Sequence, residues 1–531
     1  MAQSPARCIY WIGPQASAQF AQALAEWRSA APPLGLLHGV CITPTAPTES
    51  ATPPEHRRVA FEHGRVLLTQ SSGVLSAVLA QIGGLADEIV LDARTALPTW
   101  DVYLCKALAR RCRVGAWLRI VHWPGTLPTQ QALLLQCGFA AQPAPANTWL
   151  GQYLPHWQTS PSGRHPADTA PGHCIVLGAG LAGAAAASSL ARRGWQVAVL
   201  DPGASAHGAS GVPAGLLAPH VSKDDSVQSR VSRAGLQATW AQARELLTPG
   251  ADWAQTGVYQ RAAQASEPPT FWHESGGWIK PARLVHAWLS QKGITVHEHA
   301  AVGQVMAPDQ TQPLWRVLDT EGRSLAQAQL LVIAAGTGTA AWLNALHAPL
   351  AEPSQRVSAF LQTIRGQVTC AHYAPGDGMD ALLPTTPVNG DGSLIPHIPM
   401  NGRLMWLCGA SYQRGDSDLQ QRESDQQSNL ARLRCLLPGN GTALAQLAQT
   451  QAAQGLLQAW VGLRCATTDR LPVVGPLCKE VEATGLWLCT GLGSRGLTYA
   501  ALCGELLAAR LHQEPLPLPF SLARCMDSAR I

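Results

Sequence analysis

Short apolar runs alternate with amphipathic stretches along the first part of the chain. The runs RVLLT, EIVLDAR and AWLRIVHWP have the length and composition of strands, whereas ASAQFAQALAEWRSA and DVYLCKALARRC have the spacing of helices. Because strands that alternate with helices build parallel sheets, the pattern predicts an α/β domain over residues 1–153.

A second strand–helix region follows a stretch without periodicity. Residues 154–172 are rich in Pro, Gly, Ser and His, which is typical of an interdomain linker. Beyond it, CIVLGAGLAGAAAASSLARRGWQVAVLD indicates a strand, a glycine turn, an Ala-rich helix and a further strand. GLWLCTGLGSRGLTYAALCGELLAARL indicates a closing strand, turn and helix. The sequence therefore predicts a second domain over residues 173–531.

Composition narrows the class of protein only moderately. The 531 residues are 46% hydrophobic and 14% charged, so a large core can form and wholesale disorder is excluded. The formal net charge of +4 permits binding to a polyanion but does not argue for it.

Cysteine usage and the N-terminal residues favour a cytoplasmic protein. None of the 14 cysteines forms a Cys-x-x-Cys pair, so no zinc ribbon or thioredoxin-like motif is present. The start MAQSPARCIYWIGPQ lacks the pattern of a secretory signal. Cys174 to Ala191 is apolar enough to suggest a membrane helix, but its glycines and the following Arg192 and Arg193 favour a buried strand, turn and helix.

Three glycines mark a dinucleotide site. Gly178, Gly180 and Gly183 have the spacing G-x-G-x-x-G directly after the strand CIVL. Such glycines permit a tight turn, a close approach of pyrophosphate and close packing of helix on strand. The next strand ends in Asp201, at the spacing expected for an acid that binds a ribose hydroxyl.

FAD and NAD share this turn, so later segments have to discriminate between them. GASGVPAGLLAPH begins at Gly208, LLVIAAGTGT runs into Gly336, and GLGSRG precedes a helix. A helix N-terminus near the ring would stabilise negative charge on reduced flavin. The candidate cofactor-binding residues are Gly178, Gly180, Gly183, Asp201, Ser210, Gly211, Gly215, Val302, Gly336, Gly491, Gly493, Ser494 and Gly496.

These segments together resemble a known family. GAGLAG, GASGVPAGLLAP, GGWIKPARL, GLRCATTDRLPVVG and GLGSRG are similar to the D-amino acid oxidase and glycine oxidase superfamily of FAD enzymes. SGVPAGLLAPHVSKDD, GASYQRGDSD with ESDQQSNLARL, and LGSRGLTYAALCGELLAAR are closer to the oxidoreductase half of a bifunctional family that modifies the wobble uridine of tRNA. The fold expected is a glutathione-reductase-like nucleotide fold with a mixed-sheet substrate domain.

The resemblance implies both a reaction and its partners. Its oxidase half uses FAD to remove the carboxymethyl group from 5-carboxymethylaminomethyl-2-thiouridine, which leaves the aminomethyl nucleoside. The expected cofactor is FAD and the expected partner is tRNA, with no metal and no membrane. A small-molecule amine or glycine oxidase, a non-catalytic tRNA-binding relic and a fully bifunctional oxidase–methyltransferase are the alternatives.

Arg464 is the candidate catalytic cation. In the resembling glycine oxidases, the Arg of the stretch matched by GLRCATTDRLP holds the substrate carboxylate, and an Arg fork binds a carboxylate in a way that Lys cannot. Cys465 stands where the small-molecule oxidases have Pro, a departure that favours the tRNA family. Arg495 is a second candidate, with a structural role in the turn as the alternative. Trp278 is expected to pack in the core.

The N-terminal domain is expected to be a degenerate methyltransferase. Its strands resemble those of the family's methyltransferase half, but only Gly13 remains of the G-F-G-T-G turn, and Pro14 removes a backbone donor. Thr43 stands where an acid would bind ribose, which leaves Asp92 as the remaining acid. The basic run at residues 56–58 is expected to be a solvated face rather than a phosphate track. Loss of S-adenosylmethionine binding follows as the prediction.

Overall fold

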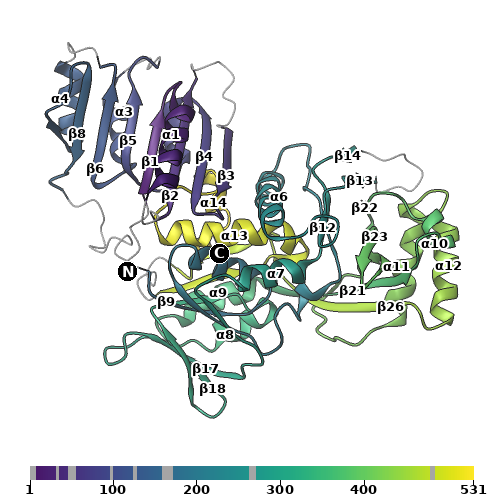
Figure 1. Cartoon of the computed structure of the whole chain (residues 1–531). Helices are drawn as coiled ribbons and strands as arrows, with labels where there is room; N and C mark the ends of the chain where they lie inside the picture. The colour runs from purple at the N-terminus through teal and green to yellow at the C-terminus, as the bar shows by residue number, and fades with distance from the viewer. Residues whose placement is uncertain are drawn as a thin grey trace. The chain divides into compact units, whose positions relative to one another are not determined.

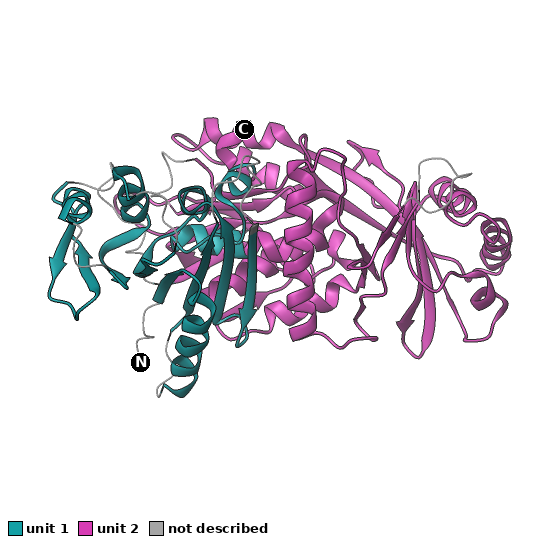
Figure 2. Ribbon diagram, turned by 90° about the horizontal axis from the view of Figure 1, so that it is seen from above, with its two compact units in different colours: residues 1–172, 192–194, 505–525 teal, residues 173–191, 195–504, 526–531 magenta. Residues whose placement is uncertain are grey.

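The computed structural model describes residues 7–30, 35–45, 55–95, 100–123, 128–157, 171–261, 271–478 and 485–531. These form two units, coloured separately in Figure 2. Unit 1 contains residues 1–172, 192–194 and 505–525, and unit 2 contains residues 173–191, 195–504 and 526–531. The division into domains that the sequence predicts, at residues 153 and 173, stays a prediction. Most of the expected linker lies outside the described residues.

Unit 1 is built on one mixed sheet. Its strands are β1 (Arg7–Ile12), β2 (Leu37–Pro44), β3 (Glu55–Phe61), β4 (Val66–Gly73), β5 (Ala86–Asp92), β6 (Cys112–Val121), β7 (Phe139–Gln142) and β8 (Thr148–Tyr153). Its helices are α1 (Ala16–Ser29), α2 (Leu75–Gln81), α3 (Val102–Ala109), α4 (Pro128–Gln136) and α14 (Phe520–Arg524). The strand order is β3-β4-β2-β1-β5-β6-β8-β7 (Figure 1). Strands β4, β2, β1, β5 and β6 are parallel, whereas β3 and β8 run antiparallel to their neighbours.

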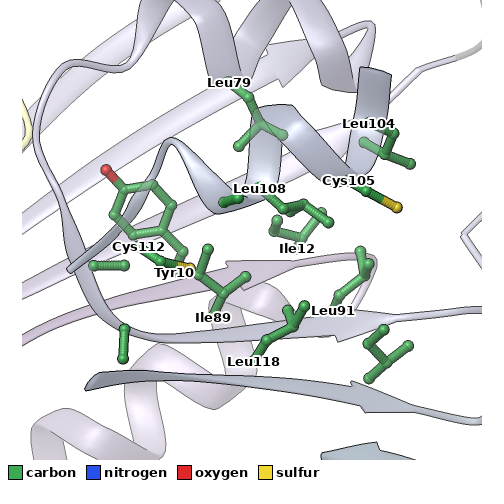
Figure 3. Close-up of a cluster of buried hydrophobic side chains, with 14 of the residues drawn as sticks. Tyr10, Ile12, Leu79, Ile89, Leu91, Leu104, Cys105, Leu108, Cys112 and Leu118 are labelled. Carbon is green, nitrogen blue, oxygen red and sulfur yellow. The ribbon is translucent and has the colours of Figure 1, made fainter. Parts of the chain in front are cut away.

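The alternation of side chains along β1 explains why the sheet is covered on both faces. Tyr10 and Ile12 point into one apolar cluster with Leu79, shown in Figure 3, and Ile9 and Trp11 point into a second cluster. A strand that is buried on both faces reads as a continuous apolar run, as parallel central strands do. The predicted strands and helices of this region are therefore confirmed, with a parallel centre.

One expectation about unit 1 is wrong. The run His56, Arg57 and Arg58 lies in β3, which forms a hairpin with β4 instead of a solvated face. His56 Nε2 lies 3.1 Å from the carbonyl of Leu516, and Arg58 donates to the carbonyl of Pro515. Only Arg57 is exposed, because successive side chains of a strand point to opposite faces.

Unit 1 also contains a cluster of buried ion pairs around Arg193. Arg193 donates to Glu514 through Nε at 2.9 Å and through Nη2 at 2.7 Å, and also pairs with Glu505. Burial alone would lower the pKa of Arg193, but the two carboxylates raise it above its ordinary value. A buried ion pair of this kind leaves an uncompensated charge if either partner is removed.

Unit 2 has a nucleotide-binding part and a mixed-sheet part, as the resemblance implies. The first contains β9 (His173–Leu177), α5 (Leu181–Ala191), β10 (Gln196–Leu200), η2 (Ala209–Gly211), β11 (Gly215–Leu217), α6 (Val227–Leu246), β12 (Trp253–Ala254), β15 (Gly277–Ile279), α7 (Pro281–Leu289), β16 (Ile294–His297), β17 (Val302–Met306), β18 (Trp315–Asp319), β19 (Ser324–Ala328), β20 (Leu330–Ile333), η3 (Gly336–Gly338), α8 (Thr339–Asn344), α9 (Ala351–Phe360), β27 (Val473–Pro476), β28 (Leu486–Thr490), η5 (Gly493–Arg495) and η6 (Ser528–Arg530). Helix α13 (Gly496–Leu511) contributes its first half here and its last residues to unit 1.

The nucleotide-binding part is a sheet in the order β16-β10-β9-β20-β28-β27. All of its strands are parallel except β27. Helix α5 is buried almost along its whole length, which agrees with the expected strand, turn and helix. Within the described ranges, no helix is both long and apolar enough to cross a membrane.

The mixed-sheet part has the order β14-β13-β22-β23-β24-β21-β25, with β26 on the remaining side of β21. Its elements are β13 (Val258–Gln260), β14 (Phe271–His273), β21 (Leu361–Tyr373), α10 (Gly378–Leu382), β22 (Val388–Gly390), β23 (Gly392–Met400), β24 (Arg403–Gly409), β25 (Gln413–Arg414), α11 (Glu423–Leu436), α12 (Gly441–Ala453) and β26 (Gln458–Thr467). Helices α11 and α12 cover one face through Leu430, Leu433 and Leu444, which pack on Trp406. Trp278 is 4% exposed in a separate cluster, so its predicted core position is confirmed.

Candidate functional site

The predicted cofactor turns follow strands of one parallel sheet. Gly178 follows β9, Asp201 follows β10, Gly336 follows β20 and Gly491 follows β28. Because the carboxyl ends of parallel strands lie at one edge of a sheet, the four positions meet there. The topology thus brings together segments that are more than three hundred residues apart in sequence, from Gly178 to Gly491.

The three glycines of the first turn are required for different reasons. A Cβ on Gly183 would overlap the carbonyl of Gly178, and a Cβ on Gly178 would lie 2.5 Å from the carbonyl oxygen of Ala334. At Gly180 the nearest atom to a Cβ is Ser210 Oγ, at 3.1 Å. Packing within the protein therefore explains Gly178 and Gly183, whereas the open space at Gly180 fits a phosphate that approaches the backbone.

Asp201 and Ser210 hold the turn in place. The Asp201 carboxylate accepts hydrogen bonds from the backbone N–H groups of Ala179 at 2.7 Å and Gly203 at 2.8 Å. Ser210 is buried and accepts a hydrogen bond from the N–H of Leu181 at the start of α5. Both side chains therefore organise the backbone around the turn, and the contact of Asp201 with a ribose remains a prediction.

The remaining cofactor candidates lie in three further segments. A Cβ on Gly211 would approach the carbonyl of Ala206, and one on Gly215 would overlap Leu497. A Cβ on Gly336 would meet no atom within 4 Å, so the backbone there is open. In the last turn, Gly491 and Gly493 have positive φ, Ser494 is exposed, and Gly496 begins α13. The N–H of Val302 is bonded to the carbonyl of Ala300, so only its other groups are available to a ligand.

Strand β26 carries the candidate cation, Arg464, and packs against three of these turns. It lies against η2, η3 and η5, the short helices that contain Gly211, Gly336 and Gly493. Arg464 is in this strand, opposite Ile364 of β21. A cation and the dinucleotide turns are therefore adjacent in unit 2, which the order of the motifs in the sequence could not establish.

Arg464 lies above a glycine and away from the carboxylates of the described residues. A Cβ on Gly366 would overlap the Arg464 guanidinium. The Arg464 side chain therefore lies over β21 at Gly366, which has no side chain of its own. Among the described residues, no carboxylate forms an ion pair with Arg464. Burial lowers the pKa of its guanidinium, and Tyr412 opposes this shift. Arg464 is half-buried, and a partly desolvated guanidinium is stabilised when an anion binds it.

Arg495 occupies a different environment. Its Nη1 lies 3.5 Å from the carbonyl of Ala218, the longest distance that still qualifies as a hydrogen bond. Burial lowers its pKa, and it in turn lowers the pKa of His220, for which burial is the larger cause. Arg495 therefore contributes positive charge near the last glycine turn.

The corresponding turn of unit 1 has a single glycine, Gly13, which directly follows its strand as Gly178 does. Strand β1 ends at Ile12 and α1 begins at Ala16, and a Cβ on Gly13 would lie 2.9 Å from the Asp92 side chain. Asp92 is paired with Arg94 at 2.9 Å and with His122 at 3.1 Å. The hydrogen bond from the Arg94 side chain is the largest cause that holds the pKa of Asp92 below its ordinary value.

Sequence reasoning missed Gly366 and Tyr412. Gly366 lies inside the long strand LQTIRGQVTCAHY, and an isolated glycine within a strand marks a close approach of another group. Tyr412 belongs to the quoted segment GASYQRGDSD, and it is 49% exposed beside Arg464. The signal was present in both cases, but its meaning depends on which strands are neighbours.

The fold and the site together define an FAD-dependent oxidoreductase. The family model described as FAD dependent oxidoreductase matches residues 173–271 and 261–510. Glycine oxidase from Geobacillus kaustophilus has the same fold over 67% of this chain and 98% of its own, with a TM-score of 0.52 and 19% identity. The glycine turns described above fit FAD, which is the cofactor of this family.

Curated relatives narrow the family further. The "tRNA 5-methylaminomethyl-2-thiouridine biosynthesis bifunctional protein MnmC" of Polaromonas naphthalenivorans (strain CJ2) is 42% identical over 510 residues, which cover 88% of this chain and 77% of the relative. The protein of that name from Paraburkholderia phytofirmans is 32% identical and covers 90% of this chain and 78% of the relative. The chain belongs to the MnmC family, within the FAD-dependent oxidoreductases.

Proposed function

We propose that the chain oxidises the carboxymethylaminomethyl group of a wobble uridine in tRNA and releases the aminomethyl nucleoside. The observation that carries this proposal is the half-buried Arg464, which lies on the strand that contacts the dinucleotide turns and has no carboxylate partner among the described residues. The group to be removed is an N-substituted glycine, so its carboxylate is the anion that such a cation needs.

Each part of the reaction has a residue or a turn assigned to it. Bound FAD supplies the acceptor for two electrons from a C–H bond beside nitrogen. Arg464 holds the substrate carboxylate so that the neighbouring methylene is fixed in place. Loss of a hydride from that methylene and of the proton on nitrogen leaves an imine. Hydrolysis of the imine consumes one water and releases glyoxylate and the primary amine.

The turns of unit 2 are assigned to the cofactor. Gly178, Gly180 and the start of α5 would hold the pyrophosphate, and Asp201 would bind the ribose as it organises the turn. The turn at Gly491 and Gly493, followed by the N-terminus of α13, would stabilise negative charge on the reduced ring. The open backbone at Gly336 supports this assignment, since protein atoms leave that space free.

Methylation by unit 1 is proposed to be lost. The match to bifunctional relatives extends before residue 173, because it covers more of the chain than residues 173–531 contain. The strand order of unit 1, with one antiparallel strand inserted beside the last, supports a methyltransferase-like origin. The turn after β1 nevertheless has Pro14 and Gln15 where the turn of unit 2 has Ala179 and Gly180, and Asp92 is already paired with Arg94 and His122.

The test is flavin reduction under anaerobic conditions with three substrates offered separately. Glycine, sarcosine and tRNA that contains 5-carboxymethylaminomethyl-2-thiouridine are mixed with the purified protein, and the visible flavin spectrum is followed. Bleaching by the tRNA alone supports the proposal. Bleaching by glycine or sarcosine at a similar rate would instead indicate a small-molecule amine oxidase, and a spectrum unchanged by all three would indicate a relic without catalysis.

A further inference from the structure

The segment after β24 contains an exposed aromatic ring next to the candidate carboxylate anchor. Tyr412 is 49% exposed, and the guanidinium carbon of Arg414 lies 5.9 Å from the centre of its ring. A cation at this distance covers one face of an aromatic ring. The other face of a half-exposed ring remains available to a ligand.

The register of the strands places Tyr412 and Arg464 on one face of the sheet. Arg464 and Arg414 both lie opposite Ile364, on either side of β21, and residues directly opposite each other share a face. The Arg414 guanidinium lies over the Tyr412 ring, so the two side chains are on the same side of this segment. Arg464 in turn extends over Gly366, the neighbour of Ile364 on this face.

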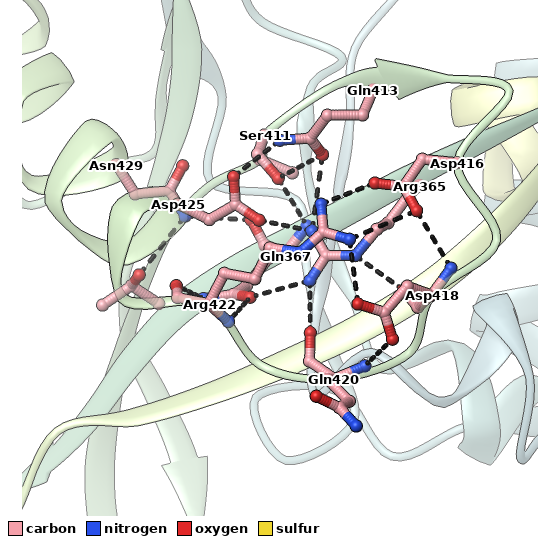
Figure 4. A network of polar contacts seen from close by, with 12 residues as sticks. Arg365, Gln367, Ser411, Gln413, Asp416, Asp418, Gln420, Arg422, Asp425 and Asn429 are labelled. Atoms are coloured by element: carbon pink, nitrogen blue, oxygen red, sulfur yellow. Dashed lines mark hydrogen bonds and ion pairs between the residues drawn. The ribbon is translucent and has the colours of Figure 1, made fainter.

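The opposite face of the same segment is locked by a buried polar network, shown in Figure 4. Arg365 is fully buried, pairs with Asp425 and donates to the carbonyl of Asp418 at 2.7 Å. Gln413 donates to Asp425 at 2.6 Å.

The residue before Tyr412 is fixed in the same way. The N–H of Ser411 is bonded to the carbonyl of Gln367 at 3.0 Å, and the Gln367 N–H donates to Ser411 Oγ at the same distance. Both neighbours of Tyr412 are therefore held, so its ring is presented by a rigid backbone.

We infer that Tyr412 is the stacking platform for the uracil ring of the substrate nucleotide, an inference that rests on the proposed function. Four covalent bonds separate the substrate carboxyl carbon from C5 of the uracil, which is about 5 Å when extended, by comparison with backbone bond lengths. A carboxylate on Arg464 therefore places the base within reach of the neighbouring Tyr412 ring. Proteins that recognise unstacked RNA bases commonly stack them on aromatic side chains.

The experiment compares Tyr412→Ala and Tyr412→Phe with the parent protein in single-turnover flavin reduction. For Tyr412→Ala, we expect the half-saturating tRNA concentration to rise about 10- to 100-fold, because stacking contributes this much per base. Tyr412→Phe keeps the ring and should stay within about twofold of the parent. Tyr259→Ala, which removes an equally exposed ring on β13, is the matched control and should have no effect.

A second measurement separates loss of stacking from disturbance of Arg464. Acetate, used as a probe of the carboxylate anchor, is titrated into each protein while the flavin spectrum is followed. Stacking predicts that Tyr412→Ala binds acetate like the parent, whereas weaker acetate binding would show that Tyr412 only supports Arg464. An unchanged tRNA dependence in Tyr412→Ala would overturn the inference. If the tRNA does not reduce the flavin of the parent protein, the proposed function itself is wrong. The role of Tyr412 is tested only by the difference between the variants and the parent.

Discussion

The turn after β1 in unit 1 and the turn after β9 in unit 2 join a strand to a helix through glycine, but only one of them leaves room for a ligand. Gly13 and Gly178 each follow their strand directly, and a Cβ on either would meet protein atoms. Two residues further on, a Cβ on Gly180 would meet only Ser210 Oγ, whereas unit 1 has Gln15 at that position. The acid beside the first turn is neutralised by Arg94, and the acid beside the second, Asp201, holds backbone N–H groups. The proposed loss of the cofactor site in unit 1 would therefore leave the strand, turn and helix in place.

The apolar core explains why the fold persists in unit 1. Tyr10, Ile12, Ile89 and Leu91 are almost fully buried on the strands that surround the turn at Gly13. Their burial does not depend on the turn residues, so changes at Gly13 and Pro14 remove a ligand site without removing the driving force for folding. Function at such a turn is lost more easily than structure.

The largest effect is expected when Gly180, the open position of the intact turn, is filled. Gly180→Val should abolish FAD binding, because the added side chain occupies the space that the pyrophosphate needs. The protein should fold and purify without colour, and soaking with FAD should not restore the visible spectrum. Gly378→Val is the control, since a Cβ there meets no atom within 4 Å and the residue lies outside the turns assigned to the cofactor. Normal FAD content in Gly180→Val would show that the backbone at Gly180 is not where the pyrophosphate binds.

A smaller effect is expected at the substrate side of unit 2. Arg464→Lys should slow flavin reduction by tRNA by about one to two orders of magnitude, since charge-assisted hydrogen bonds contribute about 1.5–3 kcal/mol each. The flavin spectrum should stay near that of the parent, because Arg464 lies on β26 and not in the turns assigned to the cofactor. Arg434→Lys, at an exposed position of α11, is the control. Reduction of Arg464→Lys at the parent rate would show that another group holds the carboxylate.

Unit 1 should also be sensitive to acid. Burial lowers the pKa of His38, and burial lowers the pKa values of His56 and His512 to about 4. These groups stay neutral in the folded state and become charged in the unfolded chain below about pH 6.5, so stability is lost as the pH falls from about 6.5 towards 4. Hydrogen exchange of unit 1 peptides, corrected for intrinsic rates, should therefore speed up across this range.

The variant His56→Gln isolates one of these groups. Glutamine does not titrate and can still donate to the carbonyl of Leu516, which His56 Nε2 contacts at 3.1 Å. We expect the variant to lose part of the pH dependence of exchange in unit 1, while peptides of unit 2 exchange like those of the parent. An identical pH dependence in the variant and the parent would mean that His56 is not buried in its neutral form.

For the binding of S-adenosylmethionine to unit 1, we expect no signal. Titration of S-adenosylmethionine into the protein should release no saturable heat, because the turn at Gly13 has Gln15 where unit 2 has Gly180, and Asp92 is already paired. Asp92→Asn should leave this result unchanged. Saturable binding in the parent protein that is lost in Asp92→Asn would show that a functional cofactor site survives in unit 1.

The features of the fold and the site that depend on local sequence patterns could be predicted from the sequence. The strands, the glycine turns and the core position of Trp278 follow from periodicity and spacing, and the structure confirms them. The burial of His56 and Arg58 was missed because it depends on which segment covers β3. Arg464 was predicted as a cation from its motif, but its path over Gly366 requires knowledge that β21 and β26 are neighbours.

The proposed function requires that unit 2 removes the carboxymethyl group and that unit 1 adds no methyl group to the product. The most direct measurement is nucleoside analysis by mass spectrometry of tRNA that contains 5-carboxymethylaminomethyl-2-thiouridine, after incubation with the protein in the presence and absence of S-adenosylmethionine. We expect the 5-aminomethyl nucleoside in both reactions, together with one glyoxylate for each nucleoside formed. Formation of the 5-methylaminomethyl nucleoside when the methyl donor is present, or recovery of the starting nucleoside in both reactions, would contradict it.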